Sequence, residues 1–222
     1  MDSSSHSHWK ETLQAGLIAG IVSVLLSLVG MVASFRERFI ISGVVSMGQV
    51  LFLAPILFMA YFALRRMTAQ NKQTILLSGA VIGLVGGAVL AALVLIGKNV
   101  DLQVMFVNSS PVLHDILTFK QGVFPGLLIL LALCALIGVL AGAFILLPPR
   151  IATAVAQGAT WVLLVGLLRD LILTVTSRWG PLAGVVKSLF ANSGLKPLGA
   201  VCVFILIAGI YYWRSGRPTP AS

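Results

Sequence analysis

Six long apolar runs, separated by short polar segments, constrain the fold of this chain more than any other feature of its sequence. They cover about residues 13–35, 39–64, 74–97, 125–147, 151–174 and 198–213. A helix needs about 20 apolar residues to cross the hydrocarbon of a bilayer, and a spanning segment must satisfy its own backbone polar groups there. The sequence therefore predicts an all-α fold, a polytopic bundle of about six transmembrane helices.

The composition agrees with a membrane domain and excludes a soluble one. Of the 222 residues, 59% are hydrophobic and 9% are charged, whereas soluble domains carry about 25% charged residues. We expect one membrane domain over residues 13–213, a polar N-terminal tail over residues 1–12 and a polar C-terminal tail over residues 214–222. The basic residues behind the net charge of +9 lie at the ends of the runs, where they reach lipid headgroups. The lipid bilayer is thus the expected partner, and nucleic acid is not.

Two connections between runs are long enough to hold structure of their own. Each contains apolar residues at helical spacing, namely Val112, Ile116 and Leu117 in the first, and Leu182, Val185, Val186, Leu189 and Phe190 in the second. Both stretches are too short and too charged to span a bilayer. We expect each to form a helix that lies along the membrane surface, with a re-entrant segment as the alternative.

The distribution of basic residues bears on the orientation of the chain in the membrane. With the N-terminus inside, seven lysines and arginines lie on each side of the membrane. Short loops next to span ends carry most weight, and residues 65–72 (RRMTAQNK) form the densest basic short loop. This loop favours an N-terminus inside the cell.

Small residues recur at regular intervals within several runs, which is typical of surfaces where helices pack closely. The first run carries Gly16, Gly20, Ser23, Ser27, Gly30 and Ser34 at alternating steps of four and three. The third run carries Gly79, Gly83, Gly87 and Ala91, and the fourth carries Gly138 and Gly142. We call these sets the small-residue seams. Packing within the bundle is the favoured interpretation, ahead of docking to another protein.

Polar side chains recur at helical spacing on each of two runs. Ser42, Ser46 and Gln49 lie at positions i, i+4 and i+7 of the second run, and therefore on one face of a continuous helix. A similar stripe on the fifth run comprises Thr153, Gln157 and Thr160. Hydrogen bonding between helices is the favoured interpretation, and a polar path across the membrane is the alternative.

Arg169 and Asp170 form the one ionisable pair within an apolar run, in WVLLVGLLRDLILTV. A charge inside the bilayer is costly, so such a residue is a functional candidate by default. Adjacent helical residues point about 100° apart, so we expect Asp170 to be poorly placed to neutralise Arg169. The alternative is that the span ends near Leu168 and that the pair marks the membrane boundary. Both interpretations remain open at this point.

The sequence contains no recognisable catalytic, cofactor-binding or metal-binding set. His114 and Asp115 are adjacent in a surface stretch, but no nucleophile or second carboxylate accompanies them. Cys134 and Cys202 lie within apolar runs, which suits small apolar fillers rather than a disulfide or metal site. We therefore predict that the chain is not an enzyme.

The segment VASFRERFIISGVVSMGQVLFLAPILFMAYFALRR, residues 32–66, resembles hydrophobic N-terminal regions of bacterial ABC importer permeases of the branched-chain amino-acid type. The similarity lies in a basic–acidic–basic hairpin, followed by a span with Ser, Gly and Gln that ends in paired Arg. It covers about a sixth of the chain. The Glu-Ala-Ala…Gly loop that engages the ATPase in such permeases has no counterpart here, so the resemblance implies an accessory or partial module.

Two hypotheses about function follow. The first is a membrane component of a transport system in a bacterial inner membrane, for amino acids or similar small solutes, with any ATPase on a separate chain. It predicts that Arg169, Asp170, Ser42, Ser46 and Gln49 converge on a cavity. The second is a non-catalytic structural or assembly subunit that docks onto other membrane subunits through its small-residue faces.

Overall fold

The computed structural model describes residues 3–35, 38–67, 71–99, 116–118, 121–176, 180–190 and 194–215. Six helices are long and apolar enough to cross a membrane: Trp9–Leu28, Met47–Arg65, Lys72–Gly97, Val123–Leu146, Pro149–Leu167 and Pro197–Arg214. The predicted all-α bundle is therefore confirmed, and we treat the chain as an integral membrane protein. The surface helix expected around Val112, together with His114 and Asp115, lies outside the described residues, apart from a short piece at residues 116–118.

The chain divides into two compact units, which we describe separately. The first unit comprises residues 1–36 and 48–146, and the second comprises residues 37–47 and 147–222. The second unit therefore takes its helices from the C-terminal third of the chain and a short segment from near the N-terminus.

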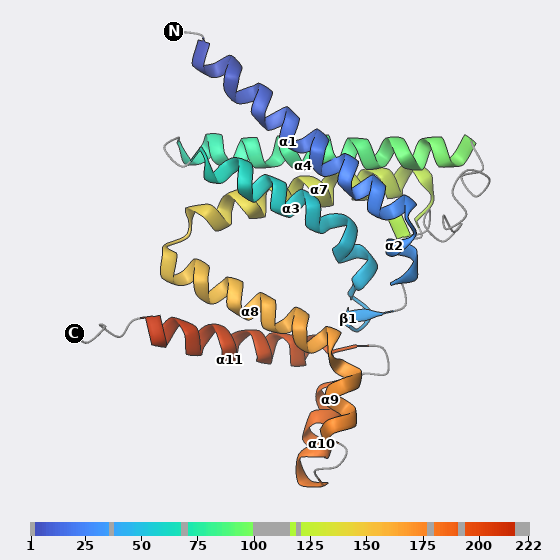
Figure 1. Ribbon diagram of the computed structural model, residues 1–222, viewed down its shortest axis with the longest axis vertical. Helices are drawn as coiled ribbons and strands as arrows, with labels where there is room; N and C mark the ends of the chain where they lie inside the picture. The colour runs from blue at the N-terminus through green and yellow to red at the C-terminus, as the bar shows by residue number, and fades with distance from the viewer. Residues whose placement is uncertain are drawn as a thin grey trace. The chain divides into compact units, whose positions relative to one another are not determined.

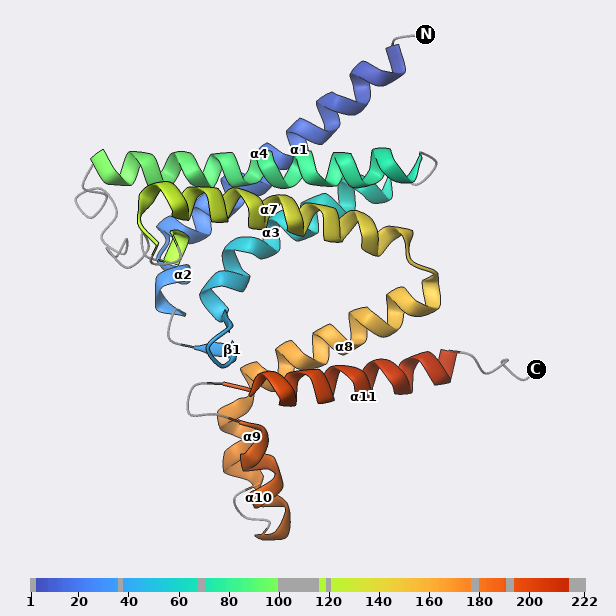
Figure 2. The ribbon, with the colours of Figure 1, turned by 180° about the vertical axis from the view of Figure 1, so that it is seen from behind.

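Helix α4 (Lys72–Asn99) is the centre of the first unit, with α1 (Ser3–Leu28) on one side and α7 (Val123–Leu146) on another. Figure 1 and the reverse view in Figure 2 show α4 and α7 lying side by side. The nearest approaches give the helix directions: Gly16 with Val85, Gly20 with Val89, Gly79 with Gly138, and Gly142 with Ile75. Helix α1 thus runs parallel to α4, and α7 runs antiparallel to it.

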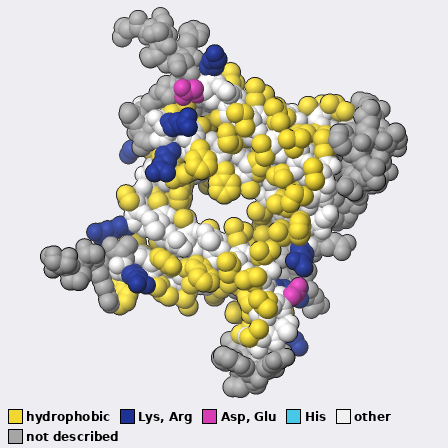
Figure 3. All heavy atoms as spheres, in the orientation of Figure 1, with side chains coloured by type: hydrophobic (Ala, Val, Ile, Leu, Met, Phe, Trp, Pro, Cys, Tyr) yellow, Lys and Arg dark blue, Asp and Glu magenta, His cyan; other side chains and the backbone are white. Residues whose placement is uncertain are grey.

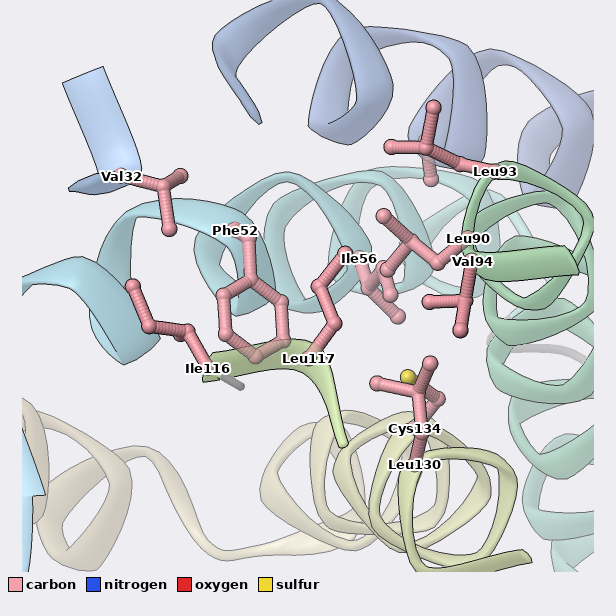
Figure 4. Close-up of a cluster of buried hydrophobic side chains, with 11 residues drawn as sticks. Val32, Phe52, Ile56, Leu90, Leu93, Val94, Ile116, Leu117, Leu130 and Cys134 are labelled. Carbon is pink, nitrogen blue, oxygen red and sulfur yellow. The ribbon is translucent and has the colours of Figure 1, made fainter. Parts of the chain in front are cut away.

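Helix α3 (Met47–Arg65) completes the core of this unit. Its buried residues recur every four positions, from Gly48 through Phe52, Ile56 and Ala60 to Leu64. Figure 4 shows Phe52 and Ile56 of α3 among side chains from α4, from α7 and from residues 116–117. Because lipid is as apolar as these side chains, the cluster holds the helices together by close packing rather than by exclusion of water.

The first helix ends earlier than the sequence predicted. Helix α1 stops at Leu28, and Gly30 adopts a φ of 85°, the left-handed conformation with which many helices end. The Gly30 amide donates to the Ser27 carbonyl at 3.2 Å, and a four-residue helix, α2 (Met31–Ser34), follows the turn. The prediction of one continuous helix over residues 13–35 is therefore wrong over its last seven residues.

The second run does not begin as a helix. Residues 39–46 form an antiparallel hairpin of β1 (Phe39–Ile41) and β2 (Val45–Ser46), with a φ of 73° at Gly43 in its turn. Bulky and β-branched residues such as Phe39 and Ile41 suit a strand as well as a buried helix. The predicted helix over residues 39–64 is therefore wrong over its first eight residues, and α3 begins at Met47.

The hairpin makes its tertiary contacts within the second unit. Strand β1 pairs in parallel at Ile41 with Leu195, through a bond from the Ser42 amide to the Leu195 carbonyl at 2.8 Å. The Leu195 amide donates in turn to the Ile40 carbonyl at 3.1 Å. These bonds satisfy backbone groups that a short sheet would otherwise leave open at its edge.

Two antiparallel spans, α8 (Pro149–Leu167) and α11 (Pro197–Ser215), form the body of the second unit. Two shorter helices, α9 (Arg169–Thr176) and α10 (Gly180–Leu189), connect them. Val162, Phe190, Leu195 and Ala200 form a small buried cluster where α8, α10 and α11 meet. Helix α10 confirms that the second long connection contains a helix, whereas its position at the membrane surface stays a prediction.

Candidate functional site at the end of α8

The break between α8 and α9 places the Arg169–Asp170 pair at the end of a span rather than inside one. Helix α8 ends at Leu167, and Leu168 leaves helical geometry with φ −87° and ψ 11°. The 19 residues of α8 rise about 28 Å at 1.5 Å per residue, which matches a hydrocarbon core of about 30 Å. This geometry agrees with the interpretation that the pair marks the membrane boundary, and the predicted span over residues 151–174 is too long.

Arg169 and Asp170 do contact each other, contrary to the expectation from helical geometry. Arg169 Nη1 lies 3.7 Å from Asp170 Oδ1, and the side chains are 23% and 76% exposed. Both residues belong to the first turn of α9, directly after the irregular Leu168, where the backbone departs from a regular helix. At 3.7 Å the contact is an ion pair without a hydrogen bond, and such exposed pairs contribute about 0–1 kcal/mol.

The guanidinium of Arg169 retains donor capacity that the described residues do not use. Its Nε is buried and has no hydrogen-bond partner among the residues that the structure describes. A guanidinium carries five N–H donors in a rigid fork that matches carboxylate and phosphate geometry. Arg169 is thus a partly buried cation at the end of a span, with an N–H donor that no described residue accepts.

The predicted stripe of Ser42, Ser46 and Gln49 does not exist as one helical face. Ser42 lies in the hairpin turn, Ser46 lies in β2 and is buried, and Gln49 lies in α3. Gln49 also belongs to the first unit, whereas the two serines and Arg169 belong to the second. The five candidate residues therefore do not form one site within either unit.

The hydroxyl groups of α8 bond to their own helix. Thr153 Oγ1 donates to the Pro149 carbonyl and Thr160 Oγ1 to the Ala156 carbonyl, each at 2.8 Å. A threonine that bonds back to the preceding turn satisfies its hydroxyl without any other helix. Both threonines are exposed, and these bonds alone account for their tolerance in an apolar environment.

The seams of α4 and α7 lie against each other at backbone contact. A Cβ on Gly79 or on Gly83 would overlap the carbonyl of Gly138 or of Cys134, respectively. A Cβ on Gly87 would lie 2.9 Å from Cys134 Cβ, and one on Gly142 would lie 3.2 Å from the Ile75 carbonyl oxygen. Glycine is required at positions 79 and 83, because no side-chain movement relieves a clash with backbone there.

The seam of α1 divides into a packing half and a hydrogen-bonding half. Gly16 and Gly20 face α4, where an added Cβ would lie 2.7 and 2.6 Å from the Cβ atoms of Val85 and Val89. Ser23 Oγ donates to the Phe52 carbonyl of α3 at 2.7 Å, and Ser27 Oγ donates to the Ser23 carbonyl at 2.8 Å. Gly30 and Ser34 fall beyond the end of α1 and serve the turn into α2.

A further stripe of small residues, which the sequence analysis did not single out, holds the second unit together. Helix α8 buries Ala154, Gly158, Val162 and Gly166 at steps of four. A Cβ on Gly158 would lie 2.9 Å from the Phe204 ring of α11, and one on Gly166 would lie 2.7 Å from Ile40 Cγ2. The spacing is visible in the sequence, but the hairpin that packs against Gly166 is not.

No group of three or more His, Cys, Asp or Glu that would suit a metal ion occurs among the described residues. Both cysteines are free thiols, Cys134 buried in the core of the first unit and Cys202 exposed on α11. Comparison with protein-family models, with curated proteins and with solved structures gave no match for this chain.

Proposed function

We propose that the chain is a non-catalytic subunit of a larger membrane complex, and that it docks onto another membrane subunit through α11. The observation that carries the proposal is the sparse packing of the second unit. In an 18-residue apolar stretch of each span, between 28% and 44% of the residues are buried in the four spans of the first unit, against 22% in α8 and 11% in α11. Figure 3 shows that apolar side chains cover much of the visible surface.

The composition of the exposed face of α11 favours a helix rather than lipid as its neighbour. Cys202, Leu206, Gly209 and Trp213 follow one another at steps of four, three and four, and all are exposed. A Cβ added to Gly209 would meet no atom within 4 Å. A small residue does not improve the packing of flexible lipid chains, whereas it allows the backbone of a second helix to approach closely.

A photoreactive residue on this face tests the proposal directly. We expect a photoreactive amino acid at position 206 to give one protein adduct of defined mass in native membranes. The same residue at Leu136, on an exposed face of α7, serves as the control and gives lipid adducts only. Gly209→Leu should abolish both the adduct and the stoichiometric co-purification of the partner. A monodisperse monomer, or an adduct within the same chain, would contradict the proposal.

A transport system for amino acids or similar solutes is the second candidate. The observation that favours it is the partly buried side chain of Arg169, a cation whose Nε has no described partner and which lies next to an acidic residue. The resemblance of residues 32–66 to bacterial importer permeases supports a bacterial inner membrane and a separate ATPase. Uptake of labelled amino acids by cells should then fall with Arg169→Gln and not with Arg150→Gln, and equal uptake would exclude this role.

The first unit supports an N-terminus inside the cell. Helices α1 and α4 run parallel, so Lys10 lies at the same end of the unit as Lys72. Arg65 and Arg66, at the end of α3, precede Lys72 by a short connection. Four basic residues at one end fit the positive-inside rule. A cysteine at position 72 should react with an impermeant thiol reagent only after the cells are opened.

A further inference from the structure

Helices α9 and α10 form a helical hairpin that is too short to span a membrane. They contain 8 and 10 residues, about 12 and 15 Å at 1.5 Å per residue, against a core of about 30 Å. Figures 1 and 2 show α9 leading away from the end of the α8–α11 pair and α10 returning to it. Since α8 and α11 cross the bilayer, a hairpin that turns away at their end lies at the boundary between hydrocarbon and headgroups.

The side chains of α9 divide into faces that suit such a boundary. Ile172 and Leu173 pack toward the buried cluster of the second unit. Leu171 and Val175 are 59% and 51% exposed and stand one turn apart, so they form an apolar stripe. Asp170 and Thr174 form a polar, exposed stripe beside it. A helix with these two exposed stripes lies along a membrane surface, with Leu171 and Val175 toward the acyl chains.

The same end of the second unit carries an excess of positive charge. Helix α8 ends there and α11 begins there, because the two helices are antiparallel. The charged residues that the structure describes at this end are Arg38, Arg169, Lys187 and Lys196, with Asp170 as the acid among them. Four cations against one anion, beside an exposed apolar stripe, complement a surface of anionic lipid.

We propose that the α9–α10 hairpin lies on the bilayer surface and binds the phosphate of an anionic phospholipid at Arg169. The Asp170 carboxylate, 3.7 Å from Nη1, lies beyond hydrogen-bonding distance, so it leaves the terminal N–H donors of the guanidinium for phosphate, whereas Nε is buried. Arginine binds phosphate through paired N–H donors, which a lysine does not reproduce. This lipid site does not depend on the docking proposed for α11.

Brominated lipids and a fluorophore at position 175 test both parts of the proposal in the full chain. The label goes on Val175→Cys with Cys202→Ala, while Cys134 stays because its side chain is buried. The chain is placed in nanodiscs of phosphatidylglycerol and phosphatidylcholine, with bromine on the acyl chains of one lipid at a time. We expect phosphatidylglycerol at position 175 to be enriched about fivefold or more over its bulk fraction, since one interfacial cation contributes about that factor.

The controls separate an Arg169 site from general attraction by charge. Arg169→Gln should lower the enrichment about fivefold, the effect of one interfacial charge, and Arg169→Lys should restore only part of it. Arg150→Gln, at the other end of α8, should leave it unchanged. A label at Thr174→Cys, on the polar stripe, should be quenched less than the label at position 175.

Three results would overturn the proposal. Equal quenching by the two lipids in the unsubstituted chain would exclude a preference for anionic lipid, and this result needs no Arg169 variant. Enrichment that survives Arg169→Gln would exclude Arg169 as the site. Equal quenching at positions 174 and 175 would exclude a hairpin that lies with one face toward the acyl chains.

Discussion

The two units of this protein solve the problem of helix association in lipid by different means. In the first unit, glycines of α4 and α7 bring two backbones into contact, and four spans share two buried clusters. In the second unit, two spans meet along one stripe of α8, and a β-hairpin fills the space at Gly166. The first unit is thus held by its own packing, whereas the second leaves most of α11 for lipid or another chain.

The largest effect should come from a side chain placed in the α4–α7 interface. Gly83→Leu would force the α7 backbone away, because a Cβ overlaps the Cys134 carbonyl and would lie 2.9 Å from the Ala135 Cα. We expect the free energy of unfolding in mixed detergent, measured by titration with SDS, to fall by about 3 kcal/mol. Gly209→Leu introduces the same side chain where a Cβ meets no atom and should have little effect on the isolated chain. Equal losses in both variants would contradict the contrast between the units.

A smaller and more local effect should follow from Gly166→Val in the second unit. The added carbon would lie 2.7 Å from Ile40 Cγ2 and 2.9 Å from the Ile40 carbonyl oxygen, and a hairpin shifts more easily than a spanning helix. We expect the free energy of unfolding to fall by about 1–2 kcal/mol and hydrogen exchange to become faster at the amides of Ser42 and Leu195. Gly184→Val, where a Cβ meets no atom within 4 Å, is the matched control. Unchanged exchange at Ser42 would show that Gly166 does not hold the hairpin.

The smallest measurable effect should come from the hydroxyl that joins α1 to α3. Ser23→Ala removes the bond to the Phe52 carbonyl at 2.7 Å, and hydrogen bonds between membrane helices contribute about 0.6 kcal/mol on average. Thr160→Val removes a hydroxyl that bonds within its own helix, so its effect on the free energy of unfolding should be near zero. Both free energies of unfolding come from the same SDS titration. An equal decrease in Thr160→Val and Ser23→Ala would contradict the distinction between a bond that joins two helices and a bond within one helix.

Hydropathy predicted the number of spans, because length and apolarity alone decide whether a helix can cross a bilayer. It could not predict where helices stop inside an apolar run. The turn at Gly30 depends on a backbone conformation rather than on polarity, and Phe39–Ile41 are as apolar in a strand as in a helix. An apolar run of a few residues does not distinguish the two structures.

The candidate site was harder to predict than the fold because it depends on contacts between distant residues. The Ser42–Ser46–Gln49 stripe assumed a continuous helix. Residues 39–46 form a hairpin instead, so the three side chains do not share one helical face. The Arg169–Asp170 contact depends on the conformations of two adjacent side chains, which the 100° spacing of a helix does not specify. Ile41 pairs with Leu195, which lies more than 150 residues further along the chain, and no local pattern indicates such a partner.

The pairing of Ile41 with Leu195 sets an order for the biogenesis of this protein. At a synthesis rate of about 5–20 residues per second, about 8–30 s separate the appearance of the two residues on the ribosome. Within this interval four further spans enter the membrane while β1 still lacks its parallel partner. The first unit has all of its helices by residue 146 and can assemble during translation. The second unit closes only after its last span emerges, so a chain truncated before Leu195 should retain the first unit and expose the hairpin to quality-control proteases.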